Sequence, residues 1–494
     1  MRIALLSTLI FLATMSSSTY SADWAQFRGP NGSGIAEGGS PPVEFGPDNN
    51  QLWRVPVGSG HSSPCVVGDS IFLTTYHDGQ KQLAVVCLNR KDGAVRWRRK
   101  VPHKQIEKGH PSFNPASSTP VSDGKVVVAY FGSYGLICFD MNGAKQWDIP
   151  MPLAKSYGGN AISPIIVDDK VIHYRGNFSD HYLLAVNIKT GEEIWKTPLT
   201  ERFSLSIACT ATPIVADDKI ILHAANSVKA FDIASGKIVW QAACKTTATS
   251  TPVLAGNEVV VATWNQTGES ALTPVYPPFE DLLAENDKDG DKSIAKSELP
   301  KMMIFHRSEG TEAPANGMPL RFDWIDSNKN GKINQQEWTN WQSKSEQRRA
   351  QYKPHGMIAI NVNNEGELGE DQLRTLEEQG IPEVPSPLYY DGFVYFVKNG
   401  GIITCINLKT GKREYRKRTG GTGTHYASPV IANGNMYTTS GDGDISVIRL
   451  GTDPEVLTTN KIGEQVYATP AIVDSIIYVR THKALYAFGK NPLK

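Results

Sequence analysis

Short apolar runs and polar turns follow one another along nearly the whole chain, in the order expected of four hairpin-connected strands. Each unit opens with Ser-Pro or Thr-Pro and continues through two apolar strands, separated by a turn that often holds Gly or Asp-Asp. A third strand ending in Asn or Asp, a tight turn with Gly and a fourth strand complete the unit. The openings lie at Ser63-Pro64, Thr119-Pro120, Ser163-Pro164, Thr212-Pro213, Thr251-Pro252, Ser386-Pro387, Ser428-Pro429 and Thr469-Pro470.

Most units place a large aromatic residue four positions after the glycine of the last turn. The pairs are Gly93 with Trp97, Gly143 with Trp147, Gly191 with Trp195, Gly236 with Trp240, and Gly411 with Tyr415. A flat ring at this position can wedge between neighbouring units, and we expect the indole N–H to meet a backbone carbonyl there.

The spacing of the units predicts both their number and an insertion. Consecutive opening prolines are 39 to 56 residues apart, except that Pro252 and Pro387 are separated by 135. We therefore expect residues 271–354 to be inserted in the fifth unit. Residues 53–270 and 355–488 then give about 44 residues for each of eight units, the length of a four-stranded propeller blade. The prediction is an all-β, eight-bladed propeller of four-stranded antiparallel blades.

The last unit predicts how the ring closes. From Thr469 to Phe488 it holds only three strands, whereas residues 51–56 look like a lone fourth strand with Trp53 in the docking position. We expect this N-terminal strand to complete the last blade, because a closed ring leaves no blade without a neighbour.

The Ala-x-Asp/Asn and Thr-Gly-Lys-x-x-Trp pattern of these units resembles a known repeat. It is similar to the tryptophan-docking repeat of PQQ-dependent quinoprotein dehydrogenases, and equally to the propeller lipoprotein of the bacterial outer-membrane assembly machinery. Residues 23–30, Asp-Trp-Ala-Gln-Phe-Arg-Gly-Pro, resemble the leader of secreted bacterial PQQ-like propellers. The resemblance covers about 350 residues and implies the fold, but one fold hosts many activities.

The N-terminus predicts export. Arg2 precedes an apolar run over residues 3–13 and then small residues, the pattern of a secretory signal peptide ending at residue 21. The run is too short to span a bilayer, and no comparable run follows. We expect residues 22–52 to form an N-terminal extension of a monomeric mature protein in the periplasm or outside the cell.

Charge and cysteine content narrow the functional classes. Lys plus Arg and Asp plus Glu number 50 each, so no overall field attracts nucleic acid, and we expect no nucleic-acid partner. The six cysteines include no Cys-x-x-Cys pair, which argues against a zinc or redox motif. We expect most of them to be small buried residues. Because an exported protein can form disulfides, a bond between Cys209 and Cys244 stays an alternative.

The expected insertion contains two acidic twelve-residue stretches, 287–298 and 326–337, which both resemble the calcium-binding loop of EF-hands. That loop uses side-chain oxygens at positions one, three and five, a main-chain oxygen at seven and a bidentate Glu at twelve. The resemblance implies a small α-helical EF-hand domain with two Ca²⁺ sites. The implied ligands are Asp287, Asp289, Asp291, Ser293 and Glu298 in the first loop, and Asp326, Asn328, Asn330, Lys332 and Glu337 in the second.

The first loop departs from the template, because Lys292 replaces glycine at position six. The turn there requires a positive φ, which costs a non-glycine residue about 1–3 kcal/mol. Against this cost, the first loop offers four carboxylates and the second only two, so their relative affinities stay open. Apolar residues predict helices before both loops, at 279–283 and 322–325, and Trp338 and Trp341 follow the second loop at helical spacing.

Two functional classes stay open. The first is a PQQ-dependent dehydrogenase that oxidises an alcohol or sugar, but the chain lacks the adjacent cysteines and the Glu/Asn/Asp calcium set of that family. The second, which we favour, is a non-catalytic envelope propeller that binds a protein or polysaccharide. Its loops should bring together a candidate ligand face near the axis. The candidates are His61, His110, Asn114, Tyr157, Asn160, Arg202, His425, Tyr426 and Tyr467.

Overall fold

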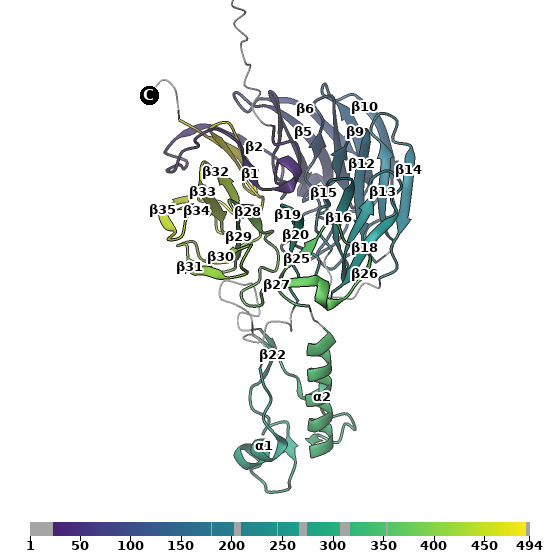
Figure 1. Ribbon diagram of the computed structural model, residues 1–494, viewed down its shortest axis with the longest axis vertical. Helices are drawn as coiled ribbons and strands as arrows, with labels where there is room; N and C mark the ends of the chain where they lie inside the picture. Colours follow the sequence, from purple (N-terminus) through teal and green to yellow (C-terminus); the bar gives the residue numbers. More distant parts are fainter. Residues whose placement is uncertain are drawn as a thin grey trace, which may run out of the picture.

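Eight four-stranded antiparallel sheets surround a common axis, as predicted (Figure 1). The computed structural model describes residues 23–178, 180–201, 209–244, 246–265, 274–306, 317–351 and 354–490. The expected signal peptide and Arg202 lie outside these residues. The first strand of a blade contacts the first strands of its neighbours, so these strands line the axis. Neither α-helix of the described chain is long and apolar enough to cross a bilayer.

The first four blades follow one another without interruption. Blade 1 contains β3 (Cys65–Val67), β4 (Ser70–His77), β5 (Gln82–Asn89) and β6 (Val95–Val101). Blade 2 contains β7 (Val121–Ser122), β8 (Val126–Phe131), β9 (Gly135–Asp140) and β10 (Lys145–Pro150). Blade 3 contains β11 (Ile165–Val167), β12 (Lys170–Gly176), β13 (His181–Asn187) and β14 (Glu193–Pro198). Blade 4 contains β15 (Ile214–Ala216), β16 (Lys219–Ala224), β17 (Ser227–Asp232) and β18 (Ile238–Ala243).

The other four blades include the interrupted one and the closing one. Blade 5 contains β19 (Val253–Ala255), β20 (Glu258–Ala262), β25 (Met357–Asn361) and β27 (Leu373–Glu377). Blade 6 contains β28 (Leu388–Tyr390), β29 (Phe393–Lys398), β30 (Ile402–Asn407) and β31 (Arg413–Arg418). Blade 7 contains β32 (Val430–Ala432), β33 (Asn435–Thr439), β34 (Asp444–Arg449) and β35 (Glu455–Lys461). Blade 8 contains β36 (Ala471–Val473), β37 (Ile476–Arg480), β38 (Ala484–Phe488) and the N-terminal β2 (Gln51–Pro56).

Strand β2 pairs antiparallel with β38, which confirms that the N-terminal strand completes the last blade. The tryptophans also dock as expected, each donating its indole N–H to a backbone carbonyl of the following blade. The acceptors are Arg90 for Trp53, Met141 for Trp97, Ile188 for Trp147, Ile233 for Trp195 and Val362 for Trp240, at 2.8–3.2 Å. The turn glycines permit this approach, since a Cβ on Gly93 would lie 2.7 Å from the ring of Trp53.

The residue before each opening proline connects one blade to the next. Its backbone N–H donates to the hydroxyl oxygen of the corresponding Ser or Thr in the following blade. Seven such bonds of 2.9–3.2 Å join, in order, Ser63, Thr119, Ser163, Thr212, Thr251, Ser386, Ser428 and Thr469. This hydroxyl ring explains why every opening has Ser or Thr before its proline, because the backbone N–H groups it satisfies are buried.

The N-terminal extension crosses the axis at one end of the ring. It pairs with β3 through Trp24 and Val66, and its turn η1 (Pro30–Gly32) lies near the centre in Figure 1. Asn31 exchanges hydrogen bonds of 2.8 and 2.9 Å with the backbone of Val215 on β15. Strand β1 (Ile35–Ala36) then adds in parallel to β32. The extension therefore connects blades 1, 4 and 7 across that end.

The segment inserted in blade 5 projects outward from the rim (Figure 1). It contains α1 (Phe279–Asn286), α2 (Gln335–Gln351), the turn η4 (Phe322–Trp324), and two short ladders. These pair β21 (Ile294–Ala295) with β24 (Lys332–Ile333) and β22 (Met303–Phe305) with β23 (Met318–Pro319). Its own core buries Phe279, Leu282, Ile294, Phe322, Ile325, Ile333, Trp338 and Trp341.

The helix predictions for this segment were partly wrong. The helix expected before the second loop is only the 3-10 turn η4, and within the described residues two α-helices flank the two loops. Pro300 lies two residues after the first loop, and Pro319 lies three residues before η4, so proline limits a helix at both places.

All six cysteines are buried and free, as expected for small core residues. Cys209 and Cys244 therefore form no disulfide. Two further short elements complete the described structure: β26 (Gly366–Leu368), which adds in parallel to β18, and the turns η2 (Asp78–Gln80) and η5 (Glu370–Gln372).

Candidate functional site

The loops that lead into the first strands of the blades bring several of the expected ligand-face rings together. The ring centroids of Tyr426 and Tyr467 are 4.7 Å apart, and those of Tyr467 and His61 are 5.0 Å apart. Those of His110 and Tyr157 are 5.6 Å apart. These five residues, here called the aromatic arc, come from loops of blades 7, 8, 1, 2 and 3.

Hydrogen bonds join the two halves of the aromatic arc. The N–H of His61 donates to Ala116 O at 3.0 Å, and Asn114 Nδ2 donates to Ser59 Oγ at 3.2 Å. His110 Nδ1 lies 2.7 Å from Ser112 Oγ in the same loop. The loop that carries His110 and Asn114 is therefore fastened to the loop that carries His61.

Exposure and charge suit the aromatic arc to an uncharged contact surface. The side chain of Tyr157 is 48 % exposed. Burial, helped by the positive charges of Arg480 and His482, lowers the pKa of His61 to about 3, so its imidazole is neutral at physiological pH. Rings with one apolar face and one polar tip are typical of binding surfaces.

Three of the expected ligand-face residues, Asn114, Asn160 and His425, are buried. Asn160 Nδ2 donates to Glu107 Oε2 at 3.2 Å, and Tyr130 donates to Asn160 Oδ1 at 3.4 Å. The backbone N–H of His425 donates to Asn399 Oδ1 at 2.7 Å, and burial lowers the pKa of its imidazole to about 4. Asn160 and His425 are positioned to hold the loops.

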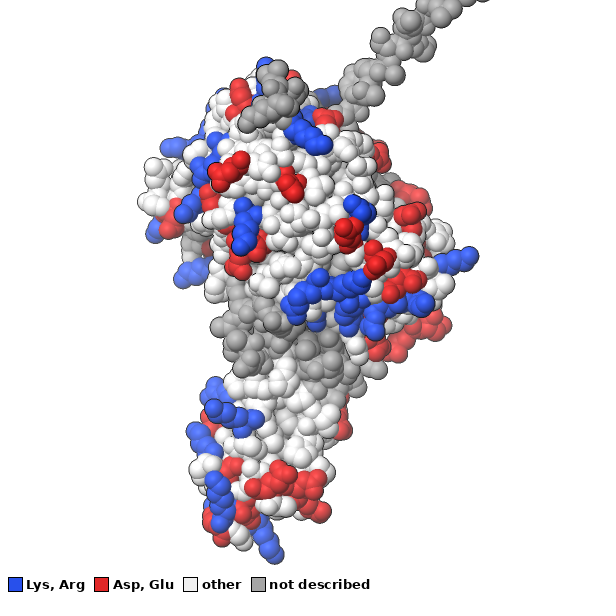
Figure 2. Space-filling view, turned by 90° about the vertical axis from the view of Figure 1, so that its left-hand side faces the viewer, with Lys and Arg blue, Asp and Glu red and all other residues white. Residues whose placement is uncertain are grey.

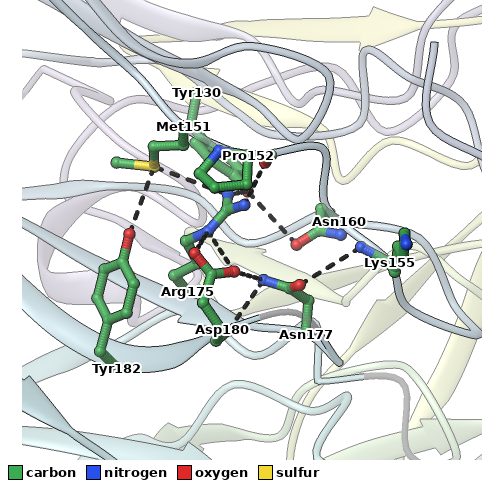
Figure 3. A network of polar contacts seen from close by, with 9 residues as sticks. All are labelled: Tyr130, Met151, Pro152, Lys155, Asn160, Arg175, Asn177, Asp180 and Tyr182. Carbon is green, nitrogen blue, oxygen red and sulfur yellow. Dashed lines mark hydrogen bonds and ion pairs between the residues drawn. The ribbon is translucent and has the colours of Figure 1, made fainter. Parts of the chain in front are cut away.

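A buried arginine, not anticipated from the sequence, organises a polar network that includes residues of the loop carrying Tyr157 (Figure 3). Arg175 on β12 donates from Nε to both carboxylate oxygens of Asp180, at 2.8 and 2.7 Å, and from Nη1 to Tyr130 at 2.9 Å. It also donates to the carbonyl of Pro152. The network thus ties the loop that carries Tyr157 to the β12–β13 hairpin. An arginine within an apolar strand was the available signal.

Glu107 completes this network from the loop between blades 1 and 2. Burial raises the pKa of its carboxyl group to about 8, although Asn160 and Arg175 partly offset the effect. The carboxyl group packs so closely on Gly132 that a Cβ there would lie 2.2 Å from Oε2. Glu107 is therefore protonated in the folded protein near neutral pH.

Replacing Glu107 with glutamine should change how stability depends on pH. Between about pH 4.5 and pH 8 the unfolded chain ionises this carboxyl group while the folded chain keeps it protonated, so wild-type stability falls as pH rises. Glu107→Gln removes this loss, and its stability relative to wild type should increase by on the order of 3 kcal/mol from pH 5 to pH 8. Urea unfolding at both pH values measures the difference. A constant difference would show that Glu107 titrates normally.

In the insertion, the first acidic loop gathers its carboxylates. The ligand atoms of Asp287, Asp289 and Asp291 all lie within 4.8 Å of one another. Glu298 reaches back across the loop and accepts backbone N–H bonds from Lys288 and Ala295, at 3.0 and 2.8 Å. Hydrogen bonds from these N–H groups lower the pKa of the Glu298 carboxyl group.

The second loop repeats this arrangement. Asp326 Oδ2 accepts the Gly331 N–H at 2.9 Å, as Asp287 Oδ2 accepts the Lys292 N–H at 3.0 Å in the first loop. Glu337 accepts the N–H groups of Ser327 and Asn334, at 3.0 and 3.2 Å. The β21–β24 ladder, through Ile294 and Ile333, holds the two loops side by side.

Backbone geometry balances the two loops. Positions four and six have positive φ in both: Gly290 (72°) and Lys292 (65°) in the first loop, Lys329 (59°) and Gly331 (84°) in the second. Each loop thus has one lysine and one glycine with positive φ, and only the lysine is strained by it. The strain expected from Lys292 is therefore matched in the second loop.

Lys332 has a contact that the loop template does not include. Its Nζ lies 3.8 Å from Asp289 and also contacts Asp291, so the ammonium of the second loop partly neutralises the carboxylates of the first. An ion entering the first loop would have to displace this contact.

The eight four-stranded sheets and their docked tryptophans define a PQQ-like β-propeller. Within that class, the chain belongs to the family of outer membrane protein assembly factor BamB, which matches residues 44–274 and 350–491. The match leaves out residues 275–349. A relative described as outer membrane protein assembly factor BamB, from Burkholderia pseudomallei (strain K96243), is 24% identical over 230 residues. The alignment covers 44% of this chain and 54% of that relative, so the chain spans about half its length.

Solved structures share the fold at low sequence identity. BamB from Moraxella catarrhalis has a TM-score of 0.52 at 10% identity, covering 89% of this chain and 99% of that chain. A europium-containing methanol dehydrogenase has a TM-score of 0.54 at 12% identity, covering 95% and 98%. The propeller therefore occurs both in an assembly factor and in an enzyme, and the fold alone does not choose between them.

Proposed function

We propose that this protein is an exported, non-catalytic binding propeller of the bacterial cell envelope, which holds a protein or polysaccharide partner on the aromatic arc. The observation that carries the proposal is the aromatic arc itself: loops of five successive blades supply two groups of ring contacts, Tyr426–Tyr467–His61 and His110–Tyr157. The name of the Burkholderia relative, an assembly factor, supports a role in binding other envelope components.

The polar groups beneath the aromatic arc favour this role over PQQ-dependent oxidation. Glu107, Asn160 and Arg175 are buried; Asn160 donates to Glu107, and Arg175 donates to Tyr130 and Asp180. Such a set is suited to holding loops in place. Titration with PQQ in calcium, followed with a dye-linked assay, should give no quinone absorbance and no turnover; either signal would favour the dehydrogenase.

Capture from solubilised envelope tests the aromatic arc directly. A variant carrying Tyr157→Ala and Tyr426→Ala should lose the captured partner. Trp324→Ala in the insertion, which removes a ring that is 39 % exposed, is the matched control and should keep it. Equal capture by the two variants would place the binding surface elsewhere.

We further propose that the insertion binds two Ca²⁺ ions. Carboxylate, amide and main-chain oxygens are the donors that Ca²⁺ prefers, and the two loops arrange them alike. In such sites Asp287, Asp289, Asp291 and Glu298 would hold one ion, and Asp326, Asn328, Asn330 and Glu337 the other, with main-chain oxygens of Ser293 and Lys332. Bound ions would rigidify the loops and replace repulsion among the carboxylates with attraction.

Calorimetry with CaCl₂ tests the calcium sites. Wild type should bind with a Kd of about 10⁻⁵–10⁻³ M, the range of extracellular modules. Glu337→Gln should remove one binding event, and Glu298→Gln with Glu337→Gln should remove both, because each loses a bidentate ligand. Glu285→Gln, an exposed carboxylate on α1, is the control. Unchanged binding in the double variant would overturn the assignment.

A further inference from the structure

Strand β6, at the outer edge of blade 1, carries an unusual density of positive charge. Arg96, Arg98, Arg99 and Lys100 are four of its seven residues. Their contacts are with neutral groups: Arg96 Nη1 donates to Ser70 Oγ at 2.8 Å, and Arg99 Nε donates to Gly143 O at 2.6 Å. Across the described ranges, no ion pair joins any of the four to a carboxylate.

His77 adds no counter-charge to this strand. Arg98 Nη1 lies 2.9 Å from His77 Nε2, and burial together with the Arg98 charge lowers the pKa of that imidazole. Burial also lowers the pKa of Arg98 itself. The strand thus holds closely spaced cations that repel one another and lack a neutralising partner.

Other outer strands neutralise their cations. Arg413 on β31 pairs with Glu377 at 2.8 Å, Lys145 on β10 with Asp148 at 2.7 Å, and Arg54 on β2 with Glu464 at 2.8 Å. Figure 2, which faces the side of the ring that carries β31 and β35, shows basic and acidic side chains close together above the insertion. Charged side chains on an exposed edge normally prevent pairing with another chain. On these three strands, however, carboxylates neutralise the cations, and on β6 they do not.

The chain itself shows that an outer edge accepts an added strand. β26 adds in parallel to β18, the outer strand of blade 4, with Trp240 opposite Gly366 and Gln241 opposite Glu367. The Gln241 side chain donates to the Glu367 carboxylate. Trp97 occupies in β6 the place that Trp240 occupies in β18, so the two edges are equivalent positions of the repeat. In β6 this position pairs on one side only, with β5.

We propose that β6 binds an extended acidic peptide segment of a partner protein as an added fifth strand of blade 1. A β-bulge between Val95 and Trp97 interrupts the alternation of side chains, and Arg96 contacts Ser70 Oγ. Arg98 and Lys100, which are two residues apart beyond the bulge, project to one side of the sheet. A peptide with Asp or Glu at every second position would match them, while its backbone would satisfy the unpaired N–H and C=O groups of the edge. This surface is separate from the aromatic arc, and the inference does not rest on the function proposed for that arc.

Peptide binding to the full-length protein tests the inference. The probe is a labelled ten-residue peptide that alternates Glu and Val, measured by fluorescence anisotropy at low salt. Arg96→Glu with Lys100→Glu, two exposed side chains, should weaken binding at least tenfold. Lys409→Glu with Lys412→Glu, which makes the same charge change at an exposed turn of blade 6, should leave it unchanged. A peptide with Lys in place of Glu should bind the β6 variant in preference to wild type.

Two further measurements separate strand addition from general charge attraction. A probe with proline at its central Val should bind at least tenfold more weakly, since it loses a backbone donor, and amides of β6 should gain hydrogen-exchange protection with the intact probe. Equal binding of the proline peptide, equal weakening by the blade 6 variant, or tighter binding of phosphatidylglycerol vesicles than of the peptide would each overturn the inference.

Discussion

Replacing Trp240 with alanine is expected to lower the free energy of unfolding by about 3–5 kcal/mol, the range for large aromatic residues in a core. The side chain is fully buried, and its N–H donates to Val362 O of the next blade at 3.2 Å. The truncation therefore leaves a cavity and an unsatisfied carbonyl at the junction of blades 4 and 5. Denaturant unfolding followed by circular dichroism measures the loss.

The control for this prediction is Trp324→Ala, which removes an exposed ring from the insertion and should change stability by less than about 1 kcal/mol. If the two variants lost equal stability, the docked tryptophans would not be what holds neighbouring blades together.

Replacing Arg175 with leucine should cost about 3–5 kcal/mol, because it leaves the partly buried carboxylate of Asp180 without its charged partner. The side chain of Arg175 is fully buried and donates to Asp180, Tyr130 and the Pro152 carbonyl. Removing both charges, in Arg175→Leu with Asp180→Leu, should recover part of the loss. Thermal and urea unfolding of the single and double variants give the coupling energy.

Lys170→Leu is the matched control on the same strand. Lys170 pairs with Asp169, whose side chain is 62 % exposed, and exposed pairs contribute about 1 kcal/mol or less. A loss in Arg175→Leu no larger than in this control would mean that the network in Figure 3 is not structurally important.

The fold was predictable because the same sequence pattern recurs in each blade. Eight Ser/Thr-Pro openings and the Gly-x-x-x-Trp spacing each report the same blade, so one degenerate unit, such as the one with Tyr415, does not hide the pattern. Closure by β2 followed from a count of strands in the last unit. The hydroxyl ring was visible only as the constant Ser or Thr before each proline, and its bonds depend on the distance between blades, which no local pattern gives.

The site was predictable only in part. Residue type and loop position indicated the rings of the aromatic arc, but they also indicated Asn114, Asn160 and His425, which the structure buries. Arg175 was missed although it interrupts an apolar strand and its partner Asp180 is only five residues away. Glu107 was missed because the residues that pack on it, Asn160 and Gly132, are distant in the chain. In the insertion the sequence indicated the residues of both loops. The helix predicted before the second loop is only the turn η4, because few residues lie between Pro319 and that loop.

Because β2 pairs with β38, the blade that contains β2 can form only after the last strand of the chain is available. During synthesis or transport, residues 51–56 must stay unpaired until about 430 further residues have followed, since their partner ends at Phe488. Loss of a C-terminal stretch that includes β38 would therefore leave β2 without its partner strand and the ring open between blades 7 and 1.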